Sequence, residues 1–152
     1  MKEIKAKIKR IKPLIKIRKN KVDKASFELL QISTDKDRLQ KELHNLQMQY
    51  LEYVQKLNKE RQSSDRKNLI LLEQNVDYLK QKWIQTLYRL KNLEKREQEQ
   101  MEILLQSKKD LNVIEKLQEK YQQQVAINIA TEEQKTIDQI AIRRFMDDEH
   151  NQ

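Results

Sequence analysis

Eleven consecutive polar residues interrupt an otherwise regular apolar repeat: Asn58-Lys-Glu-Arg-Gln-Ser-Ser-Asp-Arg-Lys-Asn68. Before this break, positions spaced alternately by three and four residues form one continuous heptad seam, and fourteen of its sixteen members are apolar. The members are Ile4, Ile8, Ile11, Ile15, Arg18, Val22, Ala25, Leu29, Ile32, Lys36, Leu39, Leu43, Leu46, Tyr50, Tyr53 and Leu57. A strict seven-residue repeat of this length predicts a long helix in a left-handed coiled coil.

A second seam follows the break. It runs through Leu69, Leu72, Val76, Leu79, Trp83, Thr86, Leu90 and Leu93, weakens at Glu97, Gln100 and Ser107, and resumes at Leu111, Ile114, Tyr121 and Val125. Two seams of similar length on either side of one polar break predict an antiparallel helical hairpin. The expected fold class is therefore all-α, a long antiparallel two-helix coiled-coil hairpin.

The expected boundaries divide the single domain into four parts. These are a basic N-terminal extension (1–12), a first helix (13–58), a turn (59–68) and a second helix (69–146) that outruns its partner at the C-terminus. Pro13 falls at an outward position and is tolerated as the first residue of a helix. Ser63, Ser64 or Asp65 is the expected N-cap of the second helix.

The C-terminal end of the second helix has two interpretations. Thr131 and Gln134 have the spacing of a capping box, which would let a short helix start afresh there. The alternative is one helix that runs on to about Phe145. We favour the single helix, because no helix breaker intervenes.

Folding the chain about the polar break gives an expected register. It sets Leu57 by Leu72, Tyr53 by Val76, Tyr50 by Leu79 and Leu46 by Trp83. The same register puts Glu97 and Gln100 on the apolar seam of the first helix, where we expect poorer packing. The aromatic residues Tyr50, Tyr53 and Trp83 form a cluster that is either part of the hairpin core or a partner contact.

The composition disfavours most enzyme classes. The 152 residues include no glycine, no cysteine and one proline, so Gly-rich phosphate loops, thiolate metal sites and thiol nucleophiles are absent. His44 and His150 are 106 residues apart in no catalytic pattern. We expect no enzymatic activity, no metal and no cofactor. The chain also lacks a signal peptide and an apolar run of about 18 residues, which favours a cytosolic protein.

The net charge of +8 is concentrated at one end. Residues 1–24 hold eleven basic and two acidic residues, whereas residues 25–152 hold 21 basic and 22 acidic residues. Such a basic segment could meet nucleic acid, anionic lipid or an acidic protein. It contains no aromatic residue, which argues against specific nucleic-acid recognition.

Both ends of the predicted hairpin carry short motifs. The first helix opens with Pro13-Leu14-Ile15-Lys16-Ile17-Arg18 and Val22-Asp23-Lys24-Ala25, and the second closes with Glu133-Gln134-Lys135-Thr136-Ile137-Asp138-Gln139-Ile140-Ala141-Ile142-Arg143-Arg144. In order and spacing, these segments resemble the opening and closing patterns of the flagellar type III export family FliJ and its counterparts in virulence secretion. Gln139 stands where the closing pattern has an acid.

The resemblance implies a cytoplasmic component of an export apparatus, peripherally associated with the inner membrane. In that family the paired ends of a stalk-like hairpin enter the hexameric export ATPase, the region toward the tip meets the export gate, and export chaperones are bound. Carried over to this chain, the gate contacts are Leu46, Tyr50, Tyr53, Leu72, Val76, Leu79 and Trp83. The ATPase contacts are Arg18, Lys19, Lys21, Asp138, Arg143 and Arg144. Three alternatives stay open: the stalk of a virulence secretion system, an unrelated coiled-coil adaptor, and a polyanion-binding protein that uses the basic N-terminus.

Overall fold

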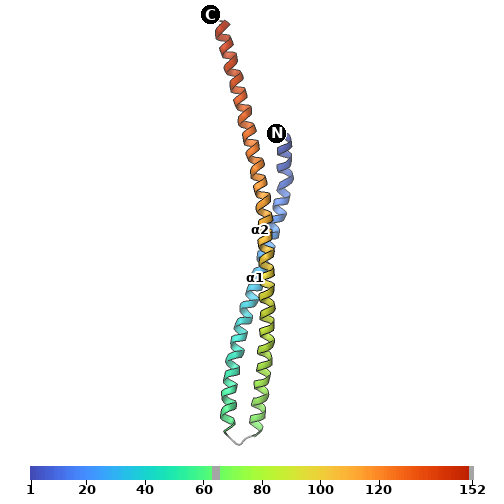
Figure 1. Cartoon of the computed structure of the whole chain (residues 1–152), viewed down its shortest axis with the longest axis vertical. Helices are drawn as coiled ribbons and strands as arrows, with labels where there is room; N and C mark the ends of the chain where they lie inside the picture. The colour runs from blue at the N-terminus through green and yellow to red at the C-terminus, as the bar shows by residue number, and fades with distance from the viewer. Residues whose placement is uncertain (63–65, 151–152) are drawn as a thin grey trace. The chain divides into compact units, whose positions relative to one another are not determined.

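The protein consists of two long helices in the computed structural model, which describes residues 1–62 and 66–150 (Figure 1). Helix α1 spans Lys2–Glu60 and helix α2 spans Arg66–His150. No strand occurs within these described ranges. The two helices pack against each other, which confirms the expected all-α helical hairpin. The expected N-cap residues Ser63, Ser64 and Asp65 lie outside the described residues.

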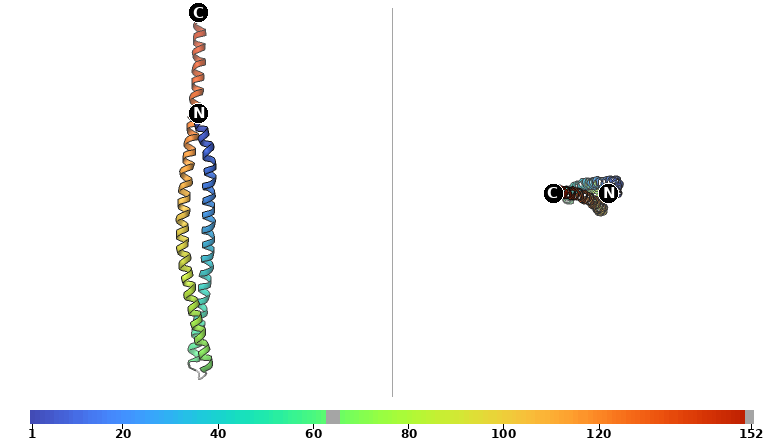
Figure 2. Two further views of the ribbon diagram at one scale, coloured as in Figure 1. Left: turned by 90° about the vertical axis from the view of Figure 1, so that its right-hand side faces the viewer. Right: turned by 90° about the horizontal axis from the view of Figure 1, so that it is seen from above.

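The chain divides into two compact units, each built from one segment of either helix. The terminal unit comprises Met1–Asp23 and Gln106–Gln152, and the turn unit comprises Lys24–Leu105. Within each unit the α1 segment lies beside the α2 segment (Figures 1 and 2). Cross-helix contacts show that both pairs are antiparallel: Lys7 meets Tyr121 and Arg18 meets Asp110 in the terminal unit. Ala25 meets Gln100 and Tyr50 meets Trp83 in the turn unit.

The helix bounds differ from the sequence-based expectation at several points. Helix α1 starts at Lys2, not at Pro13, and Pro13 lies inside it. An internal proline removes one backbone hydrogen bond, but here its ring faces outward while Ile11 and Ile15 on either side are buried in the seam. Burial of these flanking residues holds the helix through the proline. Helix α2 starts at Arg66, so part of the polar break is helical.

The predicted seam forms the interior of both units. All sixteen seam positions of α1, and every predicted seam position of α2, are buried or half-buried. The least exposed apolar residues are Ile11, Ile15, Ala25, Ile32, Leu46, Leu57, Leu79, Leu90, Leu104 and Ile114, at 4–8%. In the terminal unit, Ile11 and Ile15 pack with Ile114, and Leu111 and Tyr121 pack against this cluster. Because apolar burial is the main driving force, this seam holds the helix pair together.

The polar members of the seam have specific partners. Arg18 Nη1 donates to the Asp110 carbonyl oxygen at 2.7 Å, and Lys36 Nζ donates to Glu97 Oε1 at 3.3 Å. Gln100, only 8% exposed, donates from Nε2 to the Ala25 carbonyl oxygen at 3.3 Å and to Glu28 Oε2 at 3.1 Å. The middle of the seam, where we expected poorer packing, is therefore closed by polar contacts that satisfy its buried amide.

Helix α2 continues past the end of its pairing with α1. It runs through Thr131 without a break, and the Thr131 hydroxyl donates to the Ile127 carbonyl oxygen at 2.8 Å instead of capping a new helix. The single-helix interpretation is therefore confirmed. Residues 131–150 are all exposed, and within the terminal unit α2 runs beyond the N-terminus of α1 (Figure 2, left). We call residues 129–150 the overhang.

Candidate functional site

The features that could act in this protein are surfaces rather than cavities or ion sites. In residues 1–62 and 66–150, no three His, Cys, Asp or Glu side chains are grouped closely enough to hold a metal ion. His44 and His150 are both exposed, on different units. No described helix has an apolar stretch long enough to cross a bilayer.

The aromatic cluster of the turn unit forms across the two helices. The rings of Tyr50 and Trp83 are stacked, with centroids 6.2 Å apart and an interplanar angle of 27°. Stacked aromatic pairs at this distance add stability beyond their buried area. The expected register sets Leu46 beside Trp83. The ring that stacks on Trp83 is instead that of Tyr50, which lies one helical turn nearer to the polar break. Both rings stay half-buried, so each keeps an edge that a partner can reach.

The seven predicted gate contacts fall into two groups by exposure. Leu46 and Leu79 are 8% and 7% exposed, so they are committed to the seam between the helices. The other five are half-buried and keep an accessible edge: Tyr50, Tyr53, Leu72, Val76 and Trp83. These five are the members of the set that can both pack in the helix pair and touch another protein.

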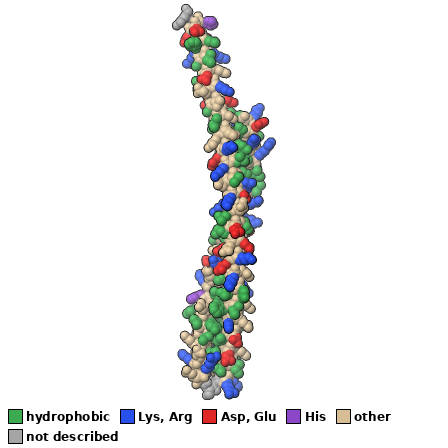
Figure 3. All heavy atoms as spheres, in the orientation of Figure 1, with side chains coloured by type: hydrophobic (Ala, Val, Ile, Leu, Met, Phe, Trp, Pro, Cys, Tyr) green, Lys and Arg blue, Asp and Glu red, His purple; other side chains and the backbone are tan. Residues whose placement is uncertain are grey.

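Large apolar side chains outside the seam add to this surface, and the sequence analysis missed them. They lie on both helices of the turn unit at 37–65% exposure: Met48, Leu51, Ile70, Leu71, Tyr78, Ile84, Leu87 and Tyr88. Figure 3 shows hydrophobic side chains gathered over both helices in the part of this unit near the polar break. The chain is very polar, with a mean hydropathy of −1.00. Large apolar residues outside the seam are therefore unusual in it, and their presence in the sequence could have indicated this surface. Contiguous exposed apolar surface marks interaction sites.

Lysines border two tyrosines of this surface, the half-buried Tyr53 and the exposed Tyr78. Lys56 Nζ lies 5.1 Å from the Tyr53 ring centroid, and Lys82 Nζ lies 4.9 Å from that of Tyr78. A hydrogen bond with Tyr78 raises the pKa of Lys82 above its ordinary value. Cation–π contacts at exposed sites are weak but orient both side chains. The surface thus combines apolar area with fixed positive charge.

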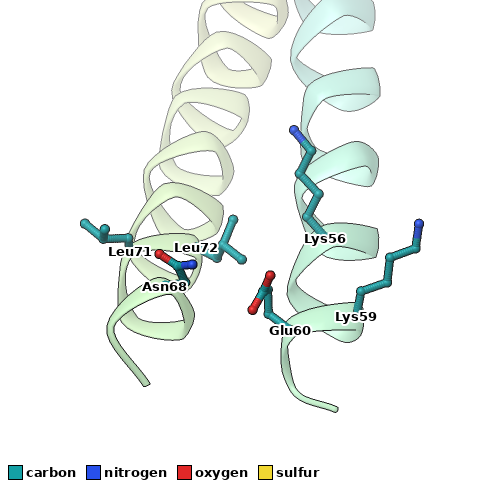
Figure 4. Close-up of a pocket in the computed structure, with 6 residues that line it drawn as sticks. All are labelled: Lys56, Lys59, Glu60, Asn68, Leu71 and Leu72. Carbon is teal, nitrogen blue, oxygen red and sulfur yellow. The ribbon is translucent and has the colours of Figure 1, made fainter. Parts of the chain in front are cut away.

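A groove lies between the two helices close to the polar break. It is lined by Lys56, Lys59 and Glu60 from α1 and by Asn68, Leu71 and Leu72 from α2. In Figure 4, Glu60 and Leu72 point into the space between the helices, whereas Lys59 and Leu71 point away from it. The groove extends the mixed apolar and charged surface to the end of the helix pair.

The six predicted ATPase contacts lie in the terminal unit but do not come together. Arg18 is half-buried and bonded to the Asp110 carbonyl oxygen, whereas Lys19 and Lys21 are exposed. Asp138, Arg143 and Arg144 lie in the overhang, all exposed. Asp138 follows Asp110 by 28 residues, which at the helical rise is roughly 42 Å along α2. One compact contact therefore cannot include both halves of the set.

An apolar row runs along α2 from Ile127, just before the overhang, to Phe145 within it. Its members, at three- and four-residue spacing, are Ile127, Ala130, Gln134, Ile137, Ala141 and Phe145, and five of the six are apolar. Ile127, Ile137 and Phe145 are 58–65% exposed. At about 100° per residue, this row lies roughly half a turn around α2 from Tyr121 and Val125 at the end of the seam. We call it the outer row; it faces away from the side on which α1 packs.

Comparison with known proteins gives one family. The family model described as the flagellar FliJ protein matches residues 7–150, nearly the whole chain. No curated protein and no solved structure shows significant similarity to the chain. The matched range includes most of α1 and all of α2, with the aromatic cluster and the overhang.

Proposed function

The chain belongs to the flagellar FliJ protein family, and on that premise we propose that it acts as a two-ended stalk in the export apparatus. The family is a non-enzymatic component of flagellar export, so the chain is an export-related component and not an enzyme. The proposal assigns the overhang and the paired ends to the hexameric export ATPase. It assigns the aromatic surface of the turn unit to the cytoplasmic domain of the export gate.

The observation that carries the ATPase assignment is the outer row. An exposed apolar row at helical spacing is what a helix presents when it docks in a groove of another protein. The row does not face α1, so pairing within the terminal unit leaves it accessible. At about 100° per residue, Arg144 and Asp138 flank it on opposite sides, which supplies charge for orientation.

The gate assignment is supported by the exposed apolar and aromatic surface of the turn unit. Tyrosine, tryptophan and methionine are enriched in protein interfaces, and they dominate the energy when they are surrounded by packed neighbours. Tyr53, Trp83 and Met48 supply these residue types on adjoining helices. Export chaperones are the third expected partner, and the same exposed apolar residues are suited to short-lived contacts with them.

Pull-downs with the purified export ATPase and the purified gate domain test the two assignments separately. Deleting residues 131–152 should weaken ATPase binding about tenfold or more and leave gate binding within about twofold, since residues 131–150 are all exposed. Leu51→Ala with Tyr78→Ala should do the reverse. Both of these side chains are about half exposed, so the helix pair survives their loss.

The matched control is Phe27→Ala with Leu30→Ala. These residues are 60% and 64% exposed on α1 of the same unit, away from the polar break. The control should bind both partners normally. If the deletion and the Leu51/Tyr78 variant each lose both partners equally while circular dichroism shows intact helices, the two-ended stalk is refuted. An adaptor with one diffuse surface would then be the better description.

A further inference from the structure

The basic residues of the terminal unit are arranged in a single line along α1. If Ile8 is heptad position a, then Lys2, Lys5, Lys9, Lys12, Lys16 and Lys19 occupy six consecutive b and e positions. All six are exposed. At the helical rise they extend over about 25 Å of one face. We call this set the lysine stripe; the next b position is Asp23, which ends it.

The charge of the stripe is not neutralised within the protein. None of its six lysines takes part in an ion pair among the described residues. The outward positions next to the stripe hold Ala6, Pro13 and Asn20, so no acid borders it on that side. On the facing segment of α2, residues 106–128 carry four basic and three acidic residues. The stripe therefore projects an unopposed positive field.

The stripe differs from the other basic residues of the same segment. Lys7, Arg10 and Lys21 lie at c and g positions, on other faces of α1. Arg18 lies in the seam and is bonded to the Asp110 carbonyl oxygen. The concentration of lysine on one face is thus a separate feature from the general basicity of the N-terminus.

From these observations we infer that the lysine stripe binds the surface of an anionic lipid bilayer, with the α1 segment of the terminal unit parallel to that surface. Six charges on one straight face of a helix can approach a planar surface together, and juxtamembrane or helical clusters of four to eight basic residues are typical of binding to anionic lipid. The stripe contains no apolar residue, so the contact is electrostatic and peripheral, without insertion of the helix.

Nucleic acid fits the stripe less well. Residues 1–24 contain no aromatic side chain on which bases could stack. The stripe contains no arginine, the residue that recognises phosphates and guanine in a bidentate manner. A flat array of flexible lysines suits dispersed lipid headgroups better than a grooved duplex.

The inference goes beyond the proposed stalk function, because it gives the protein a direct contact with lipid. Lys19 belongs both to the stripe and to the predicted ATPase contacts. Binding to lipid and binding to the ATPase should therefore exclude each other. The test below uses the purified full-length chain without the ATPase or the gate. Its result therefore does not depend on whether the stalk proposal holds.

Vesicle flotation measures the contact. Full-length protein is mixed with vesicles of phosphatidylcholine alone or with about 30% phosphatidylglycerol. We expect binding only to the anionic vesicles, falling steeply between about 50 and about 300 mM salt. Lys9→Gln with Lys12→Gln and Lys16→Gln should weaken binding about a hundredfold, since each lysine near an anionic surface is worth roughly fivefold.

The matched control is Lys7→Gln with Arg10→Gln and Lys21→Gln. It removes the same charge from the same segment, but from faces about one Debye length away, and should weaken binding less than about tenfold. Glutamine is a good helix former, so both variants should keep the helical signal in circular dichroism.

Three results would overturn the inference. One is equal weakening by the two triple variants, which would mean that the contact senses net charge and not the stripe. Another is equal binding to neutral vesicles. The third is tighter binding to a random-sequence DNA duplex than to the anionic vesicles at the same salt, which would assign the stripe to nucleic acid.

Discussion

Arg18 and Lys36 are the two polar residues in the seam of α1, and each reaches a specific partner on α2. A polar residue in an otherwise apolar seam lowers stability but favours one register, because every shifted register leaves its charge in an apolar layer. The Lys36 and Glu97 side chains are 24% and 28% exposed, so their pair is partly desolvated. The Lys36–Glu97 pair therefore favours the correct register but lowers the stability of the helix pair.

This conflict gives a prediction for the Lys36–Glu97 pair. Replacing both residues, Lys36→Leu with Glu97→Leu, should raise the free energy of unfolding by about 1–3 kcal/mol, because an apolar pair avoids the desolvation of two charges. Thermal unfolding followed by circular dichroism measures it. The control Glu52→Gln with Lys56→Gln removes an exposed i,i+4 pair and should change stability by less than about 0.5 kcal/mol. A double variant less stable than the natural chain contradicts the prediction.

Trp83 gives a second prediction at this scale. Trp83→Ala removes the ring stacked on Tyr50 and should lower the free energy of unfolding by about 1–3 kcal/mol, less than a fully buried aromatic because one edge is solvated. Tyr88→Ala is the matched control, since that ring is 65% exposed and should matter by less than about 0.5 kcal/mol. Equal effects of the two substitutions in thermal unfolding would mean that the stacking contributes nothing.

The sequence revealed which residues form the seam but not how its polar members are satisfied. Periodicity places Arg18, Lys36 and Gln100 on the inner face, because helical spacing depends on position alone. Their partners depend on side-chain reach across the helices: Arg18 meets a backbone carbonyl, which has no signature in the sequence. The exposed Met48 and Tyr78 were missed for a related reason, since a search for apolar periodicity counts only residues that fit the repeat.

At the scale of helices, the length of α2 beyond its partner is the main feature. It was predictable, because the second seam continues toward the C-terminus after the first has no residues left to match it. The start of α1 was not predictable in the same way. Pro13 is a helix-start signal by itself, but Ile4, Ile8 and Ile11 extend the seam on its N-terminal side and their burial outweighs that signal.

These two ends should respond differently to deletion. Removing residues 131–152 should lower the helical signal yet change the free energy of unfolding by less than about 0.5 kcal/mol, because the described part of this segment is exposed throughout. Removing residues 1–12 deletes three seam isoleucines and should cost on the order of 2–4 kcal/mol. Chemical denaturation monitored by circular dichroism distinguishes the two. Similar losses for both deletions would mean that the overhang packs against something in the free protein.

For the molecule as a whole, the uneven distribution of charge affects stability more than the net charge does. Residues 1–23 hold ten basic and two acidic residues, and the overhang holds three basic and six acidic residues. The lysine stripe lies within the first group, and its lysines repel one another without an ion pair to offset the repulsion. This asymmetry was visible in the sequence, whereas the alignment of six of the lysines on one face depends on a helix that is continuous from Lys2.

Salt should therefore stabilise the protein. Raising the ionic strength from about 20 to about 300 mM screens the repulsion among the stripe lysines and should raise the Tm by a few degrees. The Lys9/Lys12/Lys16→Gln variant, which already lacks half of the stripe, should show a clearly smaller increase. A Tm that falls with added salt would show that attractive ion pairs dominate instead.

The partnered polar residues of the seam also bear on how the protein withstands mechanical force. A pull along the helix axes would slide α1 past α2, and the next position in which apolar residues mesh again is one heptad away, about 10.5 Å. At that position the Lys36 ammonium would face Leu90 or Leu104 instead of Glu97. Sliding within the turn unit is thus opposed by charge as well as by packing. The turn unit can therefore transmit a push or a twist without losing its alignment. A purely apolar seam would pack equally well after a shift of one heptad and would not prevent sliding.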